Sequence, residues 1–169
     1  MKNFLLRLLL LLPLLSWADL PVVAREKAVE FTYGVSDLMY WGTKKVEAYD
    51  IAIRLNDPML IGKQVTALQV PFPSTAGMTD FKAWITTELL LEKNADGKKV
   101  NVPNVTEVAG TPVDDVLTVY FPEPYTIPAE GVYVGYSFTL TALEDQGTTP
   151  VATTGDVHPD GFYVHTSRT

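Results

Sequence analysis

The sequence of 169 residues contains no cysteine. This absence excludes a disulfide framework, a thiol nucleophile, a cysteine-ligated zinc or iron–sulfur site, and a lipidated cysteine after a leader segment. Basic residues are also few, 13 against 20 acidic ones, and the formal net charge is -7. A nucleic-acid-binding domain needs a basic patch, so this charge argues against that class. The composition therefore leaves exported, binding and hydrolytic domains to be considered.

Long hydrophobic runs are confined to the first 18 residues. Lys2 and Arg7 give this segment a positive start, and the apolar run that follows is interrupted by Pro13 and ends at Ser16-Trp17-Ala18. The run is shorter than the roughly 20 residues of a membrane-spanning helix. We therefore predict a signal peptide over 1–18, cleaved before Asp19, in place of the alternative membrane anchor.

Removal of the predicted signal peptide leaves 11 basic and 20 acidic residues in 19–169, a net charge of -9. An acidic exported domain without disulfides is more typical of bacteria than of animals, whose small secreted domains are usually disulfide-bonded. The predicted location is the cell surface or the extracellular medium, with the periplasm as a further option.

The remaining sequence alternates with a period of two. Tyr49, Ile51, Ile53 and Leu55 fall on one face of a segment whose other face carries Asp50 and Arg54, although Glu47 falls on the apolar face. Strands with one apolar and one polar face are typical of antiparallel sheets. The same pattern and its turn signals predict about eight or nine strands, at 29–33, 38–41, 46–55, 64–72, 81–92, 98–102, 116–121, 132–142 and 162–165.

Turn residues separate these segments. Asn94 to Gly97 predicts a hairpin, most prolines fall at strand ends or in loops, and 57–61 is expected to form a single helical turn. Long loops are expected at 73–80 and 143–160. We predict one antiparallel β-sandwich of jelly-roll type over 19–169. Because the sequence stops as a strand finishes, we expect an N-terminal module of a longer protein with one open sheet edge.

The segments 49–55 and 60–68 combine a strand carrying Ala-Ile-Arg, a short helix, Gly-Lys and a second strand, and 81–85 and 127–136 follow in the same order. This order resembles jelly-roll modules of secreted bacterial surface proteins, including the cleaved-adhesin (haemagglutinin) domains that accompany gingipain-type proteases. The resemblance covers about Val46 to Leu140. It implies a non-catalytic extracellular β-sandwich, and some relatives carry calcium at loop acids, which cannot be matched to residues here.

Asp156 and Asp160, spaced by four and followed by Gly161, resemble the start of a calcium-binding loop. His158 occupies the middle ligand position, and Ser167 falls where a bidentate glutamate is expected. The alternative is a solvated turn held by aspartate side chains and Pro159. Calcium is thus the single cofactor that the pattern leaves open, with Asp156 and Asp160 as its candidate ligands.

Aromatic side chains are the candidates for ligand binding. Trp84 falls on the polar face of its segment, and Tyr40 and Trp41 lie side by side in another. A flat aromatic ring can stack on a sugar or anchor a protein interface. The alternatives are that Trp84 packs under a loop or a neighbouring module and that Tyr40 and Trp41 belong to the core.

Catalytic patterns are missing from the sequence: it has no Gly-x-Ser-x-Gly elbow, no His-Glu-x-x-His helix and no phosphate-binding loop. His165 would act as a base only beside a nucleophile, and Asp114 and Asp115 are expected to form a polar loop. We expect a non-catalytic surface module that binds glycan or extracellular protein, without nucleic acid or stable membrane insertion. A spacer sandwich without a ligand and a small secreted hydrolase with two convergent carboxylates are the alternatives.

Overall fold

The computed structural model describes residues 31, 38–42, 45–95, 97–143, 151–154 and 161–168. The chain divides into two units, Met1–Tyr33 and Gly34–Thr169, and every described strand belongs to the second. The predicted signal peptide and nearly all of the strand expected at 29–33 lie outside the described residues.

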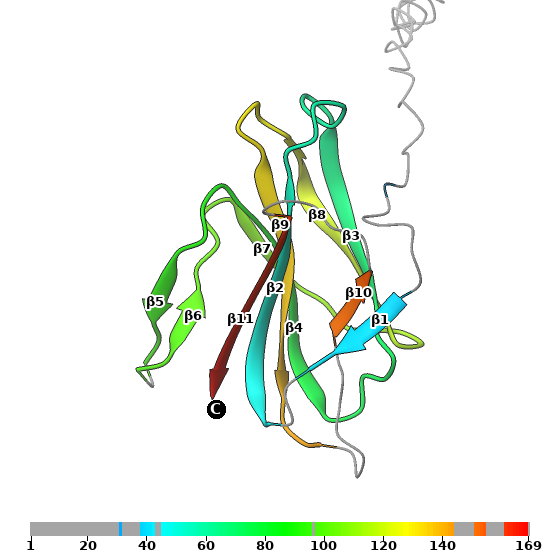
Figure 1. Ribbon diagram of the computed structural model, residues 1–169, viewed down its shortest axis with the longest axis vertical. Coiled ribbons are helices and arrows are strands. Elements are labelled where there is room, and N and C mark those ends of the chain that lie inside the picture. Colours follow the sequence, from blue (N-terminus) through cyan, green and yellow to red (C-terminus); the bar gives the residue numbers. More distant parts are fainter. Residues whose placement is uncertain are drawn as a thin grey trace, which may run out of the picture. The chain divides into compact units, whose positions relative to one another are not determined.

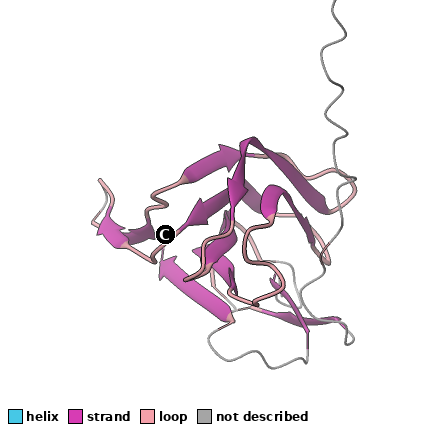
Figure 2. Cartoon of the chain, turned by 90° about the horizontal axis from the view of Figure 1, so that it is seen from above, coloured by secondary structure: helices cyan, strands magenta, loops and turns pink. Residues whose placement is uncertain are grey.

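The described residues form strands and loops without a helix (Figure 2), and every strand pair is antiparallel. This confirms the predicted all-β antiparallel sandwich. None of the described segments is a helix of the length and hydrophobicity that a membrane span requires.

The strands are β1 Leu38–Trp41, β2 Glu47–Leu55, β3 Gln64–Pro71, β4 Met78–Thr86, β5 Leu91–Lys93, β6 Lys99–Asn101, β7 Thr106–Ala109, β8 Val116–Thr126, β9 Val132–Leu140, β10 Val151–Thr154 and β11 Phe162–Arg168.

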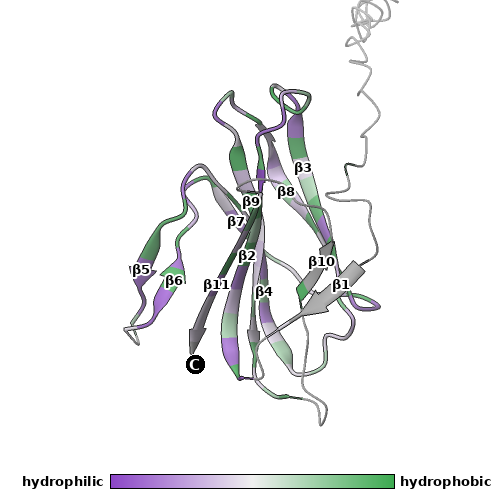
Figure 3. Ribbon diagram, in the orientation of Figure 1, coloured by the Kyte–Doolittle hydropathy of each residue, from purple (hydrophilic) through white to green (hydrophobic). Residues whose placement is uncertain are grey.

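The largest sheet has five strands in the order β11-β2-β9-β4-β7 (Figure 1). Its cross-strand register places Tyr49 opposite Phe138, and Ile51 opposite Tyr136, which in turn lies opposite Ala83. All five side chains are buried, as the period-two alternation predicts. Figure 3 shows hydrophilic residues near the start of β2 and hydrophobic residues further along it.

The second layer is formed mainly by the pair β3–β8, whose buried side chains include Val70, Leu117 and Val119. Phe72, directly after β3, brings the two layers together. Its ring makes edge-on contacts with the rings of three residues: Phe81, Tyr136 and Phe138. The ring centroids of Phe72 and Phe138 lie 5.9 Å apart. Aromatic rings prefer this geometry. Burial in this cluster raises the pKa of the Tyr136 hydroxyl well above its usual value.

One strand boundary differs from the prediction because a side chain forms a hydrogen bond with a backbone group at the end of the strand. The segment 81–92, expected as one strand, ends as β4 at Thr86 and resumes as β5 at Leu91. Asn104 accepts hydrogen bonds from the Thr87 N–H and the Thr86 hydroxyl, both at 2.9 Å. The Thr87 N–H is therefore unavailable to a continuing ladder, and the strand ends here.

Two strands were not predicted, and two, β8 and β11, extend further than the predicted 116–121 and 162–165. β7 pairs with β4, and β10, in a segment expected to be loop, pairs with β1. β8 continues through Pro122 and Pro124, which were expected at strand ends. The register with β3 shifts between Val65 and Ala67, opposite these prolines, so the prolines occupy an irregular stretch where no ladder donor is lost.

Of the two predicted turns, the hairpin is present as predicted, and the one at 57–61 is not helical. The Asn94 side chain accepts a hydrogen bond from the Lys98 N–H at 2.9 Å, and Gly97 adopts a φ of 75° in the β5–β6 hairpin. The helical turn expected at 57–61 is a non-helical turn, which Asp57 opens by accepting the Met59 N–H at 2.8 Å and Gly62 closes with a φ of 79°.

Candidate functional site

The structure places only one of the five predicted site residues. Asp156 and Asp160 lie outside the described residues, as do the side chains of Tyr40 and Trp41 in β1. Trp84, in β4, has a side chain that is fully buried (0% exposed). The structure therefore agrees with the alternative that Trp84 is a packing residue. The Trp84 ring has no exposed face on which a sugar could stack.

Trp84 packs against the sheet at a glycine. It lies opposite Gly135 of β9, and a Cβ atom built on Gly135 would lie 2.5 Å from both Cζ2 and Cη2 of the indole. The same Cβ would lie 2.5 Å from the carbonyl oxygen of Ile51. Only glycine leaves room for the indole to approach the backbone this closely. The face that the sequence marks as polar thus carries a large buried aromatic side chain.

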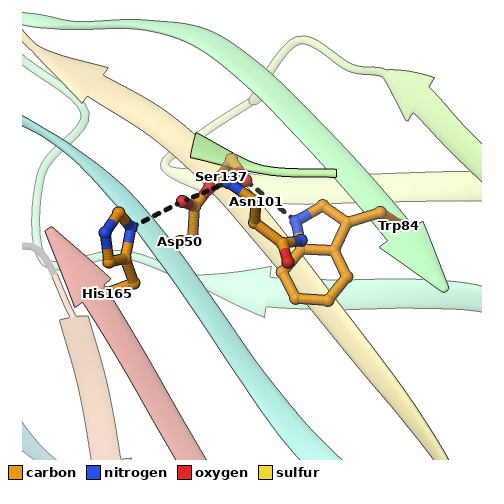
Figure 4. A network of polar contacts seen from close by, with 5 residues as sticks. All are labelled: Asp50, Trp84, Asn101, Ser137 and His165. Carbon is orange, nitrogen blue, oxygen red and sulfur yellow. Dashed lines mark hydrogen bonds and ion pairs between the residues drawn. The ribbon is translucent and has the colours of Figure 1, made fainter. Parts of the chain in front are cut away.

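A chain of polar contacts starts at this indole and crosses four strands (Figure 4). The Trp84 Nε1–H donates to the Ser137 Oγ at 2.8 Å, and the Ser137 hydroxyl donates to the Asp50 Oδ1 at 2.7 Å. The other carboxylate oxygen, Asp50 Oδ2, lies 3.1 Å from the His165 Nδ1 and accepts the Asn101 N–H at 3.3 Å. We call these five residues the polar row.

The polar row follows from the sheet register. His165 of β11, Asp50 of β2 and Ser137 of β9 lie directly opposite one another on adjacent strands. The side chains of Asp50 and His165 are only 12% and 17% exposed. A buried carboxylate needs partners for its lone pairs, and hydrogen bonds from three strands supply them.

The order of groups in the polar row differs from that of a hydrolytic triad. A serine nucleophile is activated when an imidazole lies between the hydroxyl and the carboxylate. Here the carboxylate of Asp50 lies between the hydroxyl of Ser137 and the imidazole of His165, and the hydroxyl also accepts a bond from Trp84. Because a carboxylate only accepts, the proton of His165 lies on Nδ1 and points at Asp50. The arrangement links strands, and no imidazole lies next to the Ser137 hydroxyl within the polar row.

Two side chains beside Asp50 have buried polar atoms with no hydrogen-bond partner among the described residues. Both Oδ1 and Nδ2 of Asn101 are in this state, and so is the hydroxyl of Tyr163. Burial, and to a lesser extent the negative charge of Asp50, raises the pKa of Tyr163. Buried polar groups of this kind are usually satisfied by ordered water.

A second feature lies on the outer face of the β3–β8 pair. Tyr120 is 75% exposed there, between the buried side chains of Val119 and Phe121. It lies opposite Ala67, next to the pair of Gln69 and Thr118, which are joined by a hydrogen bond of 3.2 Å. We call these four uncharged residues, Ala67, Gln69, Thr118 and Tyr120, the tyrosine face.

The acidic pair Asp114 and Asp115 lies in a loop, as the sequence predicts. Asp114 and Asp115 form the turn before β8, both with positive φ (49° and 60°). The Asp115 Oδ1 accepts the Thr75 N–H at 2.8 Å and the Thr75 hydroxyl at 2.6 Å, and these bonds lower the pKa of Asp115. A surface depression of about 420 Å³ has Asp80 as its one carboxylate. Among the described residues, no three His, Asp or Glu side chains could hold a metal ion together.

Thr75→Val should make the stability of the domain less dependent on pH in the acidic range. In the wild type the pKa of Asp115 lies below its usual value of 3.8, so the stabilisation is complete above that pH and is lost as the pH falls through the folded-state pKa. We expect the variant to melt at a lower temperature at neutral pH, and we expect this difference to shrink in strong acid as Asp115 becomes protonated in both proteins. Thermal melts across this range test it, with Thr111→Val as an exposed threonine control. A loss of equal size at neutral pH and in strong acid would contradict the assignment.

Comparison of the chain with protein-family models, curated proteins and solved structures found no match. The functional argument therefore rests on the geometry of the polar row and of the tyrosine face.

Sequence reasoning missed both features. The polar positions of the polar row were visible as the polar sides of alternating strands, but the row forms only because β11, β2, β9 and β4 are neighbours in the sheet. Tyr120 had a clearer signal. Alternation places Leu117, Val119 and Phe121 on the core face of their strand, so Tyr120 falls on the opposite face, which is turned to solvent.

Proposed function

We propose that this protein is a non-catalytic binding module of an exported surface protein, and that it binds uncharged glycan on the tyrosine face. The observation that carries the proposal is the 75% exposure of Tyr120, a large aromatic side chain in the middle of a strand. The fold does not require an aromatic residue there, since β8 already turns Leu117, Val119 and Phe121 to the core. A tyrosine ring offers an apolar surface with a polar tip, which suits the face of a sugar.

The neighbours of Tyr120 support a neutral ligand. Gln69 and Thr118 offer amide and hydroxyl groups to sugar hydroxyls, and no member of the tyrosine face carries a charge although the chain carries a net -7. The overall acidic charge disfavours a polyanionic ligand such as heparin. The non-catalytic part of the proposal is supported by the order of groups in the polar row and by the single carboxylate in the surface depression.

Tyr120→Ala should remove glycan binding without affecting the fold. We expect one neutral oligosaccharide of a panel to raise the melting temperature of the purified chain, because a ligand of the native state stabilises it. The variant should bind that oligosaccharide at least about tenfold more weakly, the typical effect of truncating a central aromatic contact. Its unliganded melting temperature should match the wild type.

The matched control is Met59→Ala, since Met59 is a similarly exposed apolar side chain (78%) in the turn after β2. It should leave both binding and melting unchanged. The same panel includes calcium, heparin and a protein extract of host-cell surfaces. Undiminished glycan binding by Tyr120→Ala would move the site elsewhere, and a melting temperature indifferent to every glycan would favour a spacer domain or a protein ligand.

A further inference from the structure

The two edge strands of the five-stranded sheet differ in how they are protected. β7 has four residues, and its Glu107 forms an ion pair of 2.7 Å with Lys82 of β4. Short strands and charged side chains are the usual means by which proteins protect an edge from pairing. β11 has seven residues, without proline, lysine or an acidic side chain and with a single arginine, Arg168, at its end, and it pairs with β2 in an unbroken register. Among the described residues β2 is its one neighbour in the sheet.

The backbone groups that β11 presents at its outer edge can be identified. The Arg54 N–H donates to the Gly161 carbonyl at 3.2 Å, which sets the phase of the ladder between β2 and β11. In an antiparallel pair, alternate residues direct both N–H and C=O to the same neighbour. Tyr163, His165 and Ser167 therefore bond to β2, and the N–H and C=O groups of Phe162, Val164, Thr166 and Arg168 point away from it.

We propose that β11 pairs antiparallel with β11 of a second copy of this chain, which joins the two large sheets into one. If the two β11 strands overlap over their full length about a two-fold axis at His165, Phe162 lies opposite Arg168 and Val164 lies opposite Thr166. Each outward-pointing N–H of one strand then meets a C=O of the other. Val164 and Thr166 are both β-branched, which favours them as a cross-strand pair.

Two further observations favour a second copy as the partner. Phe162, on the core side of the sheet opposite Ile53, is 50% exposed, and this register sets it beside the core-side residues of the other copy. The strand also opposes no like charges to itself in this register, because its one arginine, Arg168, lies opposite Phe162 of the other copy and the one self-opposed residue is His165.

Val164→Pro tests the proposal, because Val164 directs its N–H away from β2. Proline removes that donor and crowds an approaching strand while leaving the bonds to β2 in place. The matched control is Val164→Ala, which also shortens the side chain but keeps the N–H. By analytical ultracentrifugation at tens of micromolar, we expect dimers of the wild type and of Val164→Ala and monomers of Val164→Pro.

Hydrogen exchange identifies the interface independently. The amide of Thr166, which points outward, should be protected in the wild type more strongly as protein concentration rises. If Val164→Pro does not fold, His165→Lys decides, since it places a cation beside the Asp50 carboxylate but opposes two like charges in the dimer and should weaken association about tenfold. A monomeric wild type, a dimer that survives these substitutions, or a Thr166 amide indifferent to concentration would each overturn the proposal.

Discussion

Trp84→Ala is expected to lower the free energy of unfolding by about 3–5 kcal/mol, the usual cost of removing a large buried aromatic side chain. The indole is fully buried, packs closely against Gly135, and its Nε1–H is bonded to Ser137. The substitution therefore leaves a cavity and an unpaired acceptor at once. Because domains of this size are stable by only about 5–15 kcal/mol, a large part of the total would be lost. Urea denaturation followed by tyrosine fluorescence or circular dichroism measures the change.

Three companion variants separate the causes. Trp84→Phe keeps a ring and removes the Nε1–H, so it should cost less than Trp84→Ala. Gly135→Ala should also be destabilising, because its Cβ would meet the indole and the Ile51 carbonyl. Since part of that clash is with Trp84 itself, the losses of Gly135→Ala and Trp84→Ala should be less than additive in the double variant. A Trp84→Ala loss below about 1 kcal/mol, the usual range of exposed sites, would contradict the packed indole.

The second large effect is expected from Asp50→Ala, with a loss of about 3 kcal/mol in the free energy of unfolding. The substitution removes the acceptor shared by the Ser137 hydroxyl, the His165 Nδ1–H and the Asn101 N–H. Three donors from three different strands would then be buried without a partner, and each such group is costly. Urea denaturation measures the loss.

Asp50→Asn is the matched control for hydrogen bonding as opposed to charge. Its carbonyl oxygen can still accept from His165 and Asn101, and its amide can donate to Ser137, whose hydroxyl has a second lone pair. We expect a loss of about 1 kcal/mol, well below that of Asp50→Ala. Both variants should also lower the pKa of Tyr163 toward its usual value, because the charge of Asp50 contributes to raising it. Equal destabilisation by the two variants would show that charge, and not hydrogen bonding, stabilises the polar row.

Trp84 and Asp50 both lie on the outer face of the large sheet, and we expect the polar side chains of this face to stabilise the fold. The indole, the carboxylate and the serine on that face are bonded to one another, whereas Tyr120 on the opposite layer is exposed. Substitutions in the polar row should therefore change unfolding, and Tyr120→Ala should change binding. The contrast gives the functional proposal its sharpest control, because a destabilised variant and a binding-deficient variant are expected at different sites.

The strand segments could be predicted because their information is local. Alternation in β2, β4 and β9 places one apolar side chain every second residue, and that period specifies a strand wherever it lies in the chain. Asn94 and Gly97 specify the β5–β6 turn for the same reason, since glycine adopts positive φ without strain. Strand ends were less predictable, as at Thr86, because the group that ends β4 is the side chain of Asn104, 18 residues away.

The sequence alone thus determined the fold class, the faces of the main strands and the hairpin, all of which depend on neighbouring residues. Tertiary structure alone decided that Trp84 is buried and that Asp50 joins Ser137 and His165, which lie 87 and 115 residues away in the chain. The physical reason is that a period-two pattern states which side of a strand is polar but not which strand lies beside it. Strand order brings these polar sides together, and hydrogen bonding and the close approach at Gly135 then convert a face that looks solvated into a packed one.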